Sequence, residues 1–369
     1  MKTRLILLAL SLAFAGCGTK QQMPLASGDI KSFSIDFNWG DGGPNAFAGA
    51  GLWADADPAE HVKWYEDLGC NIIQTFAVSC NGYAWYKGGK IPEQPGLKHD
   101  FLPEMVKLGH AKGMQVYGYF CAGSNTRWGT ENPDLSYGIP SSPHIPYTTQ
   151  YLDFLCESIQ EALRISKIDG LMIDWMWNPE ATPEPYPALR WIDCEKQMWA
   201  ELMGEEFPGV ENLTDEGVKD FRRKALARCW DRIYKAVKSE GEHYKIWLTC
   251  SEIDNPDLAG SAIFSQADIL MNEKGEVDML EKIRSLIGPQ TQLLTCLAQW
   301  NAQDPAKIIP EAQKADIGLY GFTKPGANSL PPPIASFLEK PVDDFTGDSR
   351  NIAFFARVYN GLSADYIAK

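Results

Sequence analysis

The chain has 369 residues, of which 44% are hydrophobic and 22% charged, and its formal net charge at pH 7 is -14. This length and apolar content allow a sizeable buried core and exclude a minimal domain. The acidic excess, without a basic run, argues against nucleic acid or an anionic membrane surface as the main partner.

The N-terminal segment, residues 1–17, reads MKTRLILLALSLAFAGC, with Lys2 and Arg4 in front of an apolar run. This order is typical of a secretory signal peptide, and the apolar run is too short to span a bilayer in the mature protein. Phe-Ala-Gly-Cys resembles a bacterial lipobox and predicts lipidation of Cys17, although ordinary cleavage after Ala15 also fits. We therefore expect an exported cell-envelope lipoprotein, in the periplasm or at the outer membrane, held by an N-terminal lipid anchor. Residues 18–30 are expected to be a short tether.

Cysteine and histidine usage argues against a disulfide framework or a metal site. Eight cysteines follow Cys17, and several lie in or beside apolar runs, where a thiol acts as a small hydrophobe. The five histidines are scattered, without H-x-H or H-E-x-x-H spacing. An exported protein also has no access to cytoplasmic nucleotide cofactors. The sequence therefore predicts neither a metal nor a cofactor.

Strand-like and helical patterns alternate in the rest of the chain. The first two expected helices begin at Asp57, where Asp-Pro is a start signal, and at His99. Further helices are expected over 148–167, 217–239, 276–287, 305–315 and 349–362. Apolar runs rich in β-branched and aromatic residues precede or follow them. These runs predict strands at 32–39, 70–79, 114–123, within 167–179 with its end at Asp174, and at 244–252, 267–273, 291–300 and 317–325.

Alternating strands and helices favour parallel pairing with right-handed crossovers. Eight such units over this length predict an α/β fold of the (β/α)8 TIM-barrel type, as a single domain over residues 31–369. A doubly wound open sheet is the alternative, but no glycine-rich phosphate loop follows the first strand. Long loops are expected after strands four and eight, over residues 178–214 and 324–348.

The carboxyl ends of the predicted strands carry acidic, amide and aromatic residues, and in such a barrel these ends form the active site. Asp174 ends strand four, Glu252 ends strand five and Glu273 ends strand six. The remaining candidates for binding substrate at these ends are Asp36, Asn38, Trp39, Asn81, Tyr83, Trp85, Trp175, Trp177, Gln299, Trp300 and Lys324. Carboxylates and amides bind sugar hydroxyls, and aromatic faces stack on the C–H face of a sugar ring.

Cleavage of a glycosidic bond commonly uses two carboxyl groups, one that attacks or activates water and one that protonates the leaving oxygen. Asp174 with Glu273 or Glu252 can supply this pair. Asp169 lies at the start of the fourth strand, so we expect it at the opposite end of the barrel in a structural role.

Several motifs, in order, are similar to the hypothetical glycosyl hydrolases related to the α-L-fucosidases. They are Asn81-Gly82-Tyr83, Pro95-x-Leu97-x-x-Asp100, Gly113 and the strand IDGLMIDWMW. The resemblance covers roughly residues 32–178 and implies a barrel with retaining chemistry. It also implies that Asp174 is the nucleophile, because the second Asp of this strand has that role in the fucosidases. Asn81 stands where a substrate-binding His is common, which weakens the case for fucose.

The sequence thus predicts an exported glycoside hydrolase acting on an oligo- or polysaccharide. In this hypothesis Asp174 attacks the anomeric carbon, Glu273 is the acid/base, and Glu252 holds a hydroxyl or is the alternative acid/base. Two other readings stay open. One is a non-catalytic glycan-binding lipoprotein on the same scaffold, and the other is a metal-dependent barrel hydrolase, which the scattered histidines disfavour.

Overall fold

The computed structural model describes residues 25–40, 47–138, 144–176, 189–251, 253 and 262–368. Within these ranges, eight parallel strands form a closed barrel in sequence order. They are β1 Lys31–Ile35, β2 Ile72–Phe76, β3 Gln115–Cys121, β4 Gly170–Asp174, β5 Lys245–Cys250, β6 Ile269–Asn272, β7 Gln292–Leu297 and β8 Gly318–Thr323. The barrel closes where β1 pairs with β8, with Phe33 opposite Gly321. The predicted (β/α)8 barrel is therefore confirmed.

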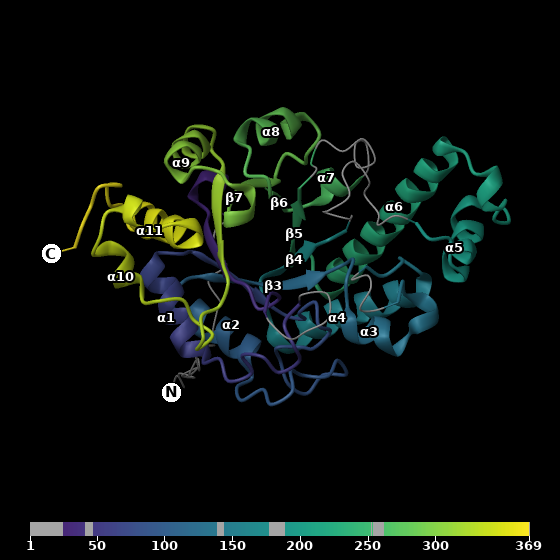
Figure 1. Cartoon of the computed structure of the whole chain (residues 1–369), viewed down its shortest axis with the longest axis horizontal. Coiled ribbons are helices and arrows are strands. Elements are labelled where there is room, and N and C mark those ends of the chain that lie inside the picture. Colours follow the sequence, from purple (N-terminus) through teal and green to yellow (C-terminus); the bar gives the residue numbers. More distant parts are fainter. Residues whose placement is uncertain are drawn as a thin grey trace, which may run out of the picture.

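Helices surround the barrel (Figure 1). They are α1 Pro58–Leu68, α2 Phe101–Ala111, α3 Thr126–Glu131, α4 Thr149–Ser166, α5 Asp193–Met203, α6 Asp215–Glu240, α7 Ala262–Gln266, α8 Val277–Lys282, α9 Pro305–Lys314, α10 Ile334–Leu338 and α11 Gly347–Tyr359. Nearly every strand residue is buried, because side chains on one face fill the barrel and those on the other pack under the helices. No helix in the described ranges combines the length and apolar character that a bilayer crossing requires.

The local signals for the first helix act as the sequence predicts. The Asp57 carboxylate accepts hydrogen bonds from the backbone N–H groups of Ala59 and Glu60, and Pro58 occupies the first turn. Gly69 ends α1 in the left-handed conformation, at φ 89°. The chain can therefore turn directly from α1 into β2.

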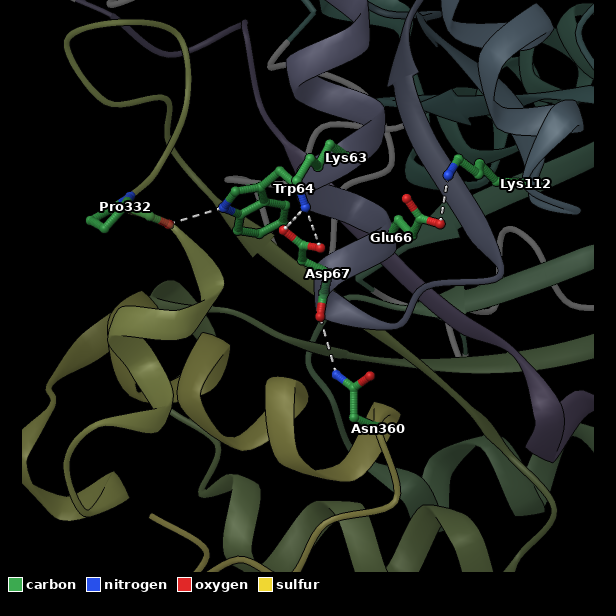
Figure 2. Close-up of polar contacts among 7 residues, drawn as sticks. All are labelled: Lys63, Trp64, Glu66, Asp67, Lys112, Pro332 and Asn360. Carbon is green, nitrogen blue, oxygen red and sulfur yellow. Dashed lines mark hydrogen bonds and ion pairs between the residues drawn. The ribbon is translucent and has the colours of Figure 1, made fainter. Parts of the chain in front are cut away.

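Contacts between the first and last helices close the outer layer of the barrel (Figure 2). The Asn360 amide, just after α11, donates to the carbonyl of Asp67 over 3.2 Å. The Trp64 indole N–H donates to the carbonyl of Pro332, which follows β8, over 3.0 Å. On the other side of α1, Glu66 forms a 2.9 Å ion pair with Lys112 after α2. Segments nearly 300 residues apart in sequence are thus held together beside β1 and β8.

The segments after β4 and β8, expected as long loops, contain helices of their own. Helix α5 lies between β4 and α6, and α10 lies between β8 and α11. Figure 1 shows α5 at the periphery beside one end of α6, and the rings of Trp199 and Phe221 stack there at 5.5 Å. Helices α3, α5, α7 and α10 add to those that the sequence predicts. The proposed signal peptide, residues 1–17, with Cys17, lies outside the described residues.

Candidate active site

A cavity of about 760 Å³ opens at the carboxyl ends of the strands. Its lining follows the period of two along each strand, which directs every second side chain into the barrel. Met172 with Asp174 on β4 and Met271 with Glu273 at β6 are such pairs, and β8 and its extension contribute Tyr320, Phe322 and Lys324. Asp36 and Asn38 line the cavity from the end of β1, and Gln299 and Trp300 from the end of β7.

Large side chains fill the barrel next to the cavity, on the side of the strands' amino ends. The Trp247 indole of β5 meets the rings of Tyr117 and Tyr320 edge-on, at centroid distances of 5.9 and 5.4 Å. The Tyr320 hydroxyl donates to the Gln74 side-chain oxygen over 3.1 Å, and both residues line the cavity. The barrel is thus filled below and open above, as expected for a site at this end.

Asp174 is a buried carboxylate at the end of β4 that accepts a hydrogen bond at each oxygen. The Tyr119 hydroxyl donates to Oδ2 over 2.9 Å, and the backbone N–H of Trp175 donates to Oδ1 over 2.8 Å. Burial raises the pKa of Asp174 to about 6, while both hydrogen bonds oppose this rise. Asp174 is therefore mostly ionised at neutral pH.

Asp36 and Glu273 are the other carboxyl groups near Asp174. Burial raises the pKa of Asp36 to about 7, and the charge of Asp174 adds to this rise, while the hydrogen bond from Asn38 N–H and the Lys324 ammonium oppose it. Burial, together with the charges of Asp174 and Asp36, raises the pKa of Glu273 well above its usual range. The surroundings of Asp174 thus favour its ionised form through two hydrogen bonds, whereas burial and two neighbouring charges favour the protonated form of Glu273.

An aromatic wall, defined as Trp39, Phe47, His144 and Trp175, stands beside this carboxylate pair. The Trp175 ring stacks on His144 at 5.3 Å with an interplanar angle of 18°, and it contacts Phe47 at 5.6 Å. Trp39 lies 6.2 Å from Trp175, and both indoles line the cavity. Trp175 adopts a left-handed conformation at φ 53°, which costs a non-glycine residue about 1 kcal/mol or more.

The other rim of the cavity carries an exposed indole and two charged groups. Trp300 is 52% exposed, and its ring meets Phe322 edge-on at 4.3 Å. Lys324 and Asp348 also line the cavity. Asp348 accepts a hydrogen bond from the backbone N–H of Gln299 over 2.9 Å. Burial raises the pKa of Asp348. An exposed indole held in a fixed orientation is suited to stack on a sugar ring.

Three predicted substrate-binding residues lie outside the cavity lining. Trp85 is 1% exposed, stacks on Phe37 at 4.4 Å and donates from its indole N–H to Ser79, so it is a core residue and cannot form part of the sugar-stacking wall. The Asn81 amide is occupied by Gln94 and by the backbone of Ala48 and Tyr83. It fixes the turn after β2 and does not face the cavity.

Tyr83 is likewise away from the cavity lining and lies under the Arg127 guanidinium, 6.0 Å from its ring centroid. Glu252 and Trp177 lie outside the described residues. The expected structural role of Asp169 agrees with its contacts, because Oδ2 accepts from the backbone N–H of Val116 and from the His110 ring at the start of β4. In the described part of the chain, no three His, Cys, Asp or Glu side chains are arranged to hold a metal ion.

Several residues that line the cavity were not predicted. The chief ones are Tyr119, Asp348, Asn301 and Cys80. The sequence pattern could have identified Tyr119. Tyr117, Tyr119 and Cys121 alternate along β3 and so share one face of the strand, and Cys121 is the register partner of Asp174. Asp348 has no such pattern, because it lies in the first turn of the last helix and not at the end of a strand.

Part of the chain matches the model of a known protein family. Residues 57–175 match the family model described as Hypothetical glycosyl hydrolase 6. This match contains α1 to β4, with Asp174, and confirms the resemblance that the sequence motifs indicate. It supports a glycosidase function. A search of curated protein sequences finds no match.

Solved structures of several glycosidases share the fold. An α-L-fucosidase isoenzyme 2 from Paenibacillus thiaminolyticus superposes with a TM-score of 0.55 at 14% identity, covering 90% of this chain and 49% of that one. A β-galactosidase from Marinomonas ef1 gives 0.55 at 11% identity, covering 91% and 61%. An α-amylase from Geobacillus thermoleovorans gives 0.50 at 12%, covering 91% and 79%. The chain spans about half the length of this fucosidase, and identities this low establish the barrel alone.

Proposed function

We propose that the protein is an exported glycoside hydrolase that cleaves its substrate with retention of configuration. The observation that carries this proposal is the pairing, in one cavity, of a hydrogen-bonded carboxylate, Asp174, with a carboxyl group, Glu273, whose pKa lies well above its usual range. Retaining glycosidases need these two states together, one group to attack and one to donate a proton.

In this mechanism the Asp174 carboxylate attacks the anomeric carbon while Glu273 protonates the departing glycosidic oxygen. The ionised Glu273 then accepts a proton from water, which attacks the anomeric carbon and releases Asp174. Asp36, whose pKa is about 7, can accept from or donate to a sugar hydroxyl near neutral pH. The different roles of Asp174 and Glu273 follow from their surroundings. Of these two carboxyl groups, Asp174 is the one that accepts two hydrogen bonds in the described part of the chain.

The substrate is proposed to be an oligo- or polysaccharide. Trp39 and Trp175 offer aromatic faces on one side of the carboxyl groups, and Trp300 offers another at the rim. Asn38, Gln299 and Lys324 supply polar groups for hydroxyls. The fold shared with an α-L-fucosidase and the motifs around Asp174 make α-L-fucosides the first substrates to assay. The lipobox-like sequence that ends at Cys17 supports the proposal that this enzyme is held in the cell envelope.

The test is the turnover of Asp174→Asn on a panel of aryl glycosides. Asparagine keeps the size of the side chain and an acceptor oxygen, so sugar binding should persist while turnover falls by at least about 10³-fold. Asp169→Asn is the matched control, because it makes the same change at the other end of β4, away from the cavity. Near-wild-type turnover in Asp174→Asn would refute the nucleophile assignment.

Two further readouts separate the alternatives. The anomeric configuration of the first product, followed by proton NMR, should match that of the substrate, and the opposite configuration would exclude retention. Tight glycan binding without hydrolysis of any aryl or natural glycoside by the wild type would instead favour a non-catalytic glycan-binding lipoprotein.

A further inference from the structure

We infer that Tyr119 is a positioning residue that holds the Asp174 carboxylate in its attacking orientation. The Tyr119 hydroxyl donates to Oδ2 of Asp174 over 2.9 Å, from the neighbouring strand β3. The inference rests on the proposed function, because an attacking orientation matters only if Asp174 is the nucleophile. In this inference Tyr119 acts through its hydrogen bond to Asp174 and not by contact with the substrate.

The surroundings of Tyr119 hold its hydroxyl in place. The residue is 3% exposed, and its ring packs against Phe76 of β2 at a centroid distance of 4.9 Å. The Cys80 thiol lies 3.6 Å from the hydroxyl, and the backbone N–H of Cys80 is itself fixed by the Asn38 side-chain oxygen over 2.8 Å. Burial raises the pKa of Tyr119, so the hydroxyl keeps its proton and remains a donor at any pH where the enzyme is folded and active.

A second donor holds the opposite oxygen of the carboxylate. The backbone N–H of Trp175 reaches Oδ1 because Trp175 turns into the left-handed conformation directly after β4. The Tyr147 hydroxyl donates to the carbonyls of Trp175 and Met176, which fixes this turn from outside the cavity. A side chain at Gly123 would come within 2.3 Å of the Trp175 carbonyl oxygen, so the turn also needs glycine there. With one donor on each oxygen, rotation of the carboxylate about its terminal bond is restricted.

Tyr119→Phe removes the donor to Oδ2 while keeping the ring and most of its volume. A hydrogen bond to a charged group is strong enough for its loss to raise the pKa of Asp174 by about one unit or more. The acid limb of the kcat/KM profile should therefore move to higher pH. At its new optimum kcat should still be reduced at least about tenfold, with KM little changed, because the attacking oxygen is less well oriented.

Other titratable groups face Asp174 and are left unchanged by this substitution. They are Asp36 after β1, Cys80 after β2, Cys121 on β3, Glu273 after β6, Cys296 on β7, and Tyr320 with Lys324 at β8. Tyr117→Phe is the matched control. It removes a buried hydroxyl from the same strand, two residues earlier on the same face, where the hydroxyl donates to the Gln115 side chain over 3.2 Å.

The closing experiment titrates Asp174 directly, by carbon NMR of protein labelled at the aspartate side-chain carboxyl, with Asp174→Asn identifying the signal. The midpoint should rise by about one pH unit in Tyr119→Phe and stay at the wild-type value in Tyr117→Phe. An unchanged midpoint in Tyr119→Phe, or equal changes in both variants, would overturn the inference whether or not the protein hydrolyses a glycoside. A wild type without hydrolysis would overturn the proposed function instead, and the two failures are thereby distinguished.

Discussion

Asp36→Asn is expected to stabilise the protein at alkaline pH and to leave its stability nearly unchanged at acidic pH. Asp36 is 8% exposed, and burial is the largest cause that raises its pKa from 3.8 to about 7. Asparagine has the same shape and its side-chain oxygen can still accept the hydrogen bond from Asn38 N–H, which is 2.6 Å long in the wild type. Unlike aspartate, it never has to ionise inside the protein.

The sign and the size follow from the pKa difference between the folded and unfolded states. Below pH 3.8 both states bind the proton, so Asp36 contributes no pH dependence. Between pH 3.8 and about 7 the unfolded chain has released a proton that the folded protein retains, and the free energy of unfolding falls as pH rises. A difference of about 3 pKa units, at ~1.4 kcal/mol each, sets a ceiling of about 4 kcal/mol for this loss, all of it present above pH 7.

The assay is urea unfolding of the wild type and Asp36→Asn at pH 4 and pH 8. The variant should gain up to about 4 kcal/mol relative to the wild type at pH 8, and little at pH 4. Asp134→Asn, at an exposed position in the 3-10 turn after α3, removes the same charge and should show no such pH-dependent gain. Equal effects of Asp36→Asn at both pH values would show that the Asp36 carboxyl is not desolvated, and the account of the cavity would be wrong. A gain in stability with a loss of activity is expected of a functional carboxylate.

Three further predictions concern the rim, the core and the N-terminus. Trp300→Ala should raise KM for an oligosaccharide roughly tenfold without lowering the melting temperature, because the indole is 52% exposed; an unchanged KM would exclude Trp300 from the substrate site. Trp85→Ala should instead lower the free energy of unfolding by about 3–5 kcal/mol in urea titrations, because the side chain is fully buried; a loss below 1 kcal/mol would contradict its place in the core. Cys17→Ser should move the expressed protein from the detergent phase to the aqueous phase, and identical partitioning of both forms would argue against lipidation.

The barrel and part of its site could be predicted because both depend on patterns local to each strand. Parallel strands buried on both faces give short apolar runs, and the residue that ends each run emerges at the same edge of the barrel. Asp174 and Glu273 follow inward-facing Met172 and Met271 by two positions, so the period of two directs them into the cavity.

The errors arose where the chain folds back over a strand end. After β2 the backbone N–H of Trp85 returns to the carbonyl of Ala77, and this reversal buries the indole against Phe37. Position after a strand therefore did not place Trp85 in the cavity. Asp348 shows the opposite case, since it lies in the first turn of the last helix and not at the end of a strand, yet it lines the cavity. Long-range packing of this kind leaves no local pattern in the sequence.

The most direct test of the account is to identify the residue that carries the sugar in a trapped glycosyl-enzyme. The enzyme would be inactivated with the 2-deoxy-2-fluoro derivative of whichever aryl glycoside it hydrolyses, then digested and analysed by mass spectrometry. The account predicts a single modified peptide with the sugar on Asp174, and no modification of Asp174→Asn. A sugar attached to Glu273 or to another residue, or active enzyme that forms no adduct and releases the inverted product, would contradict it.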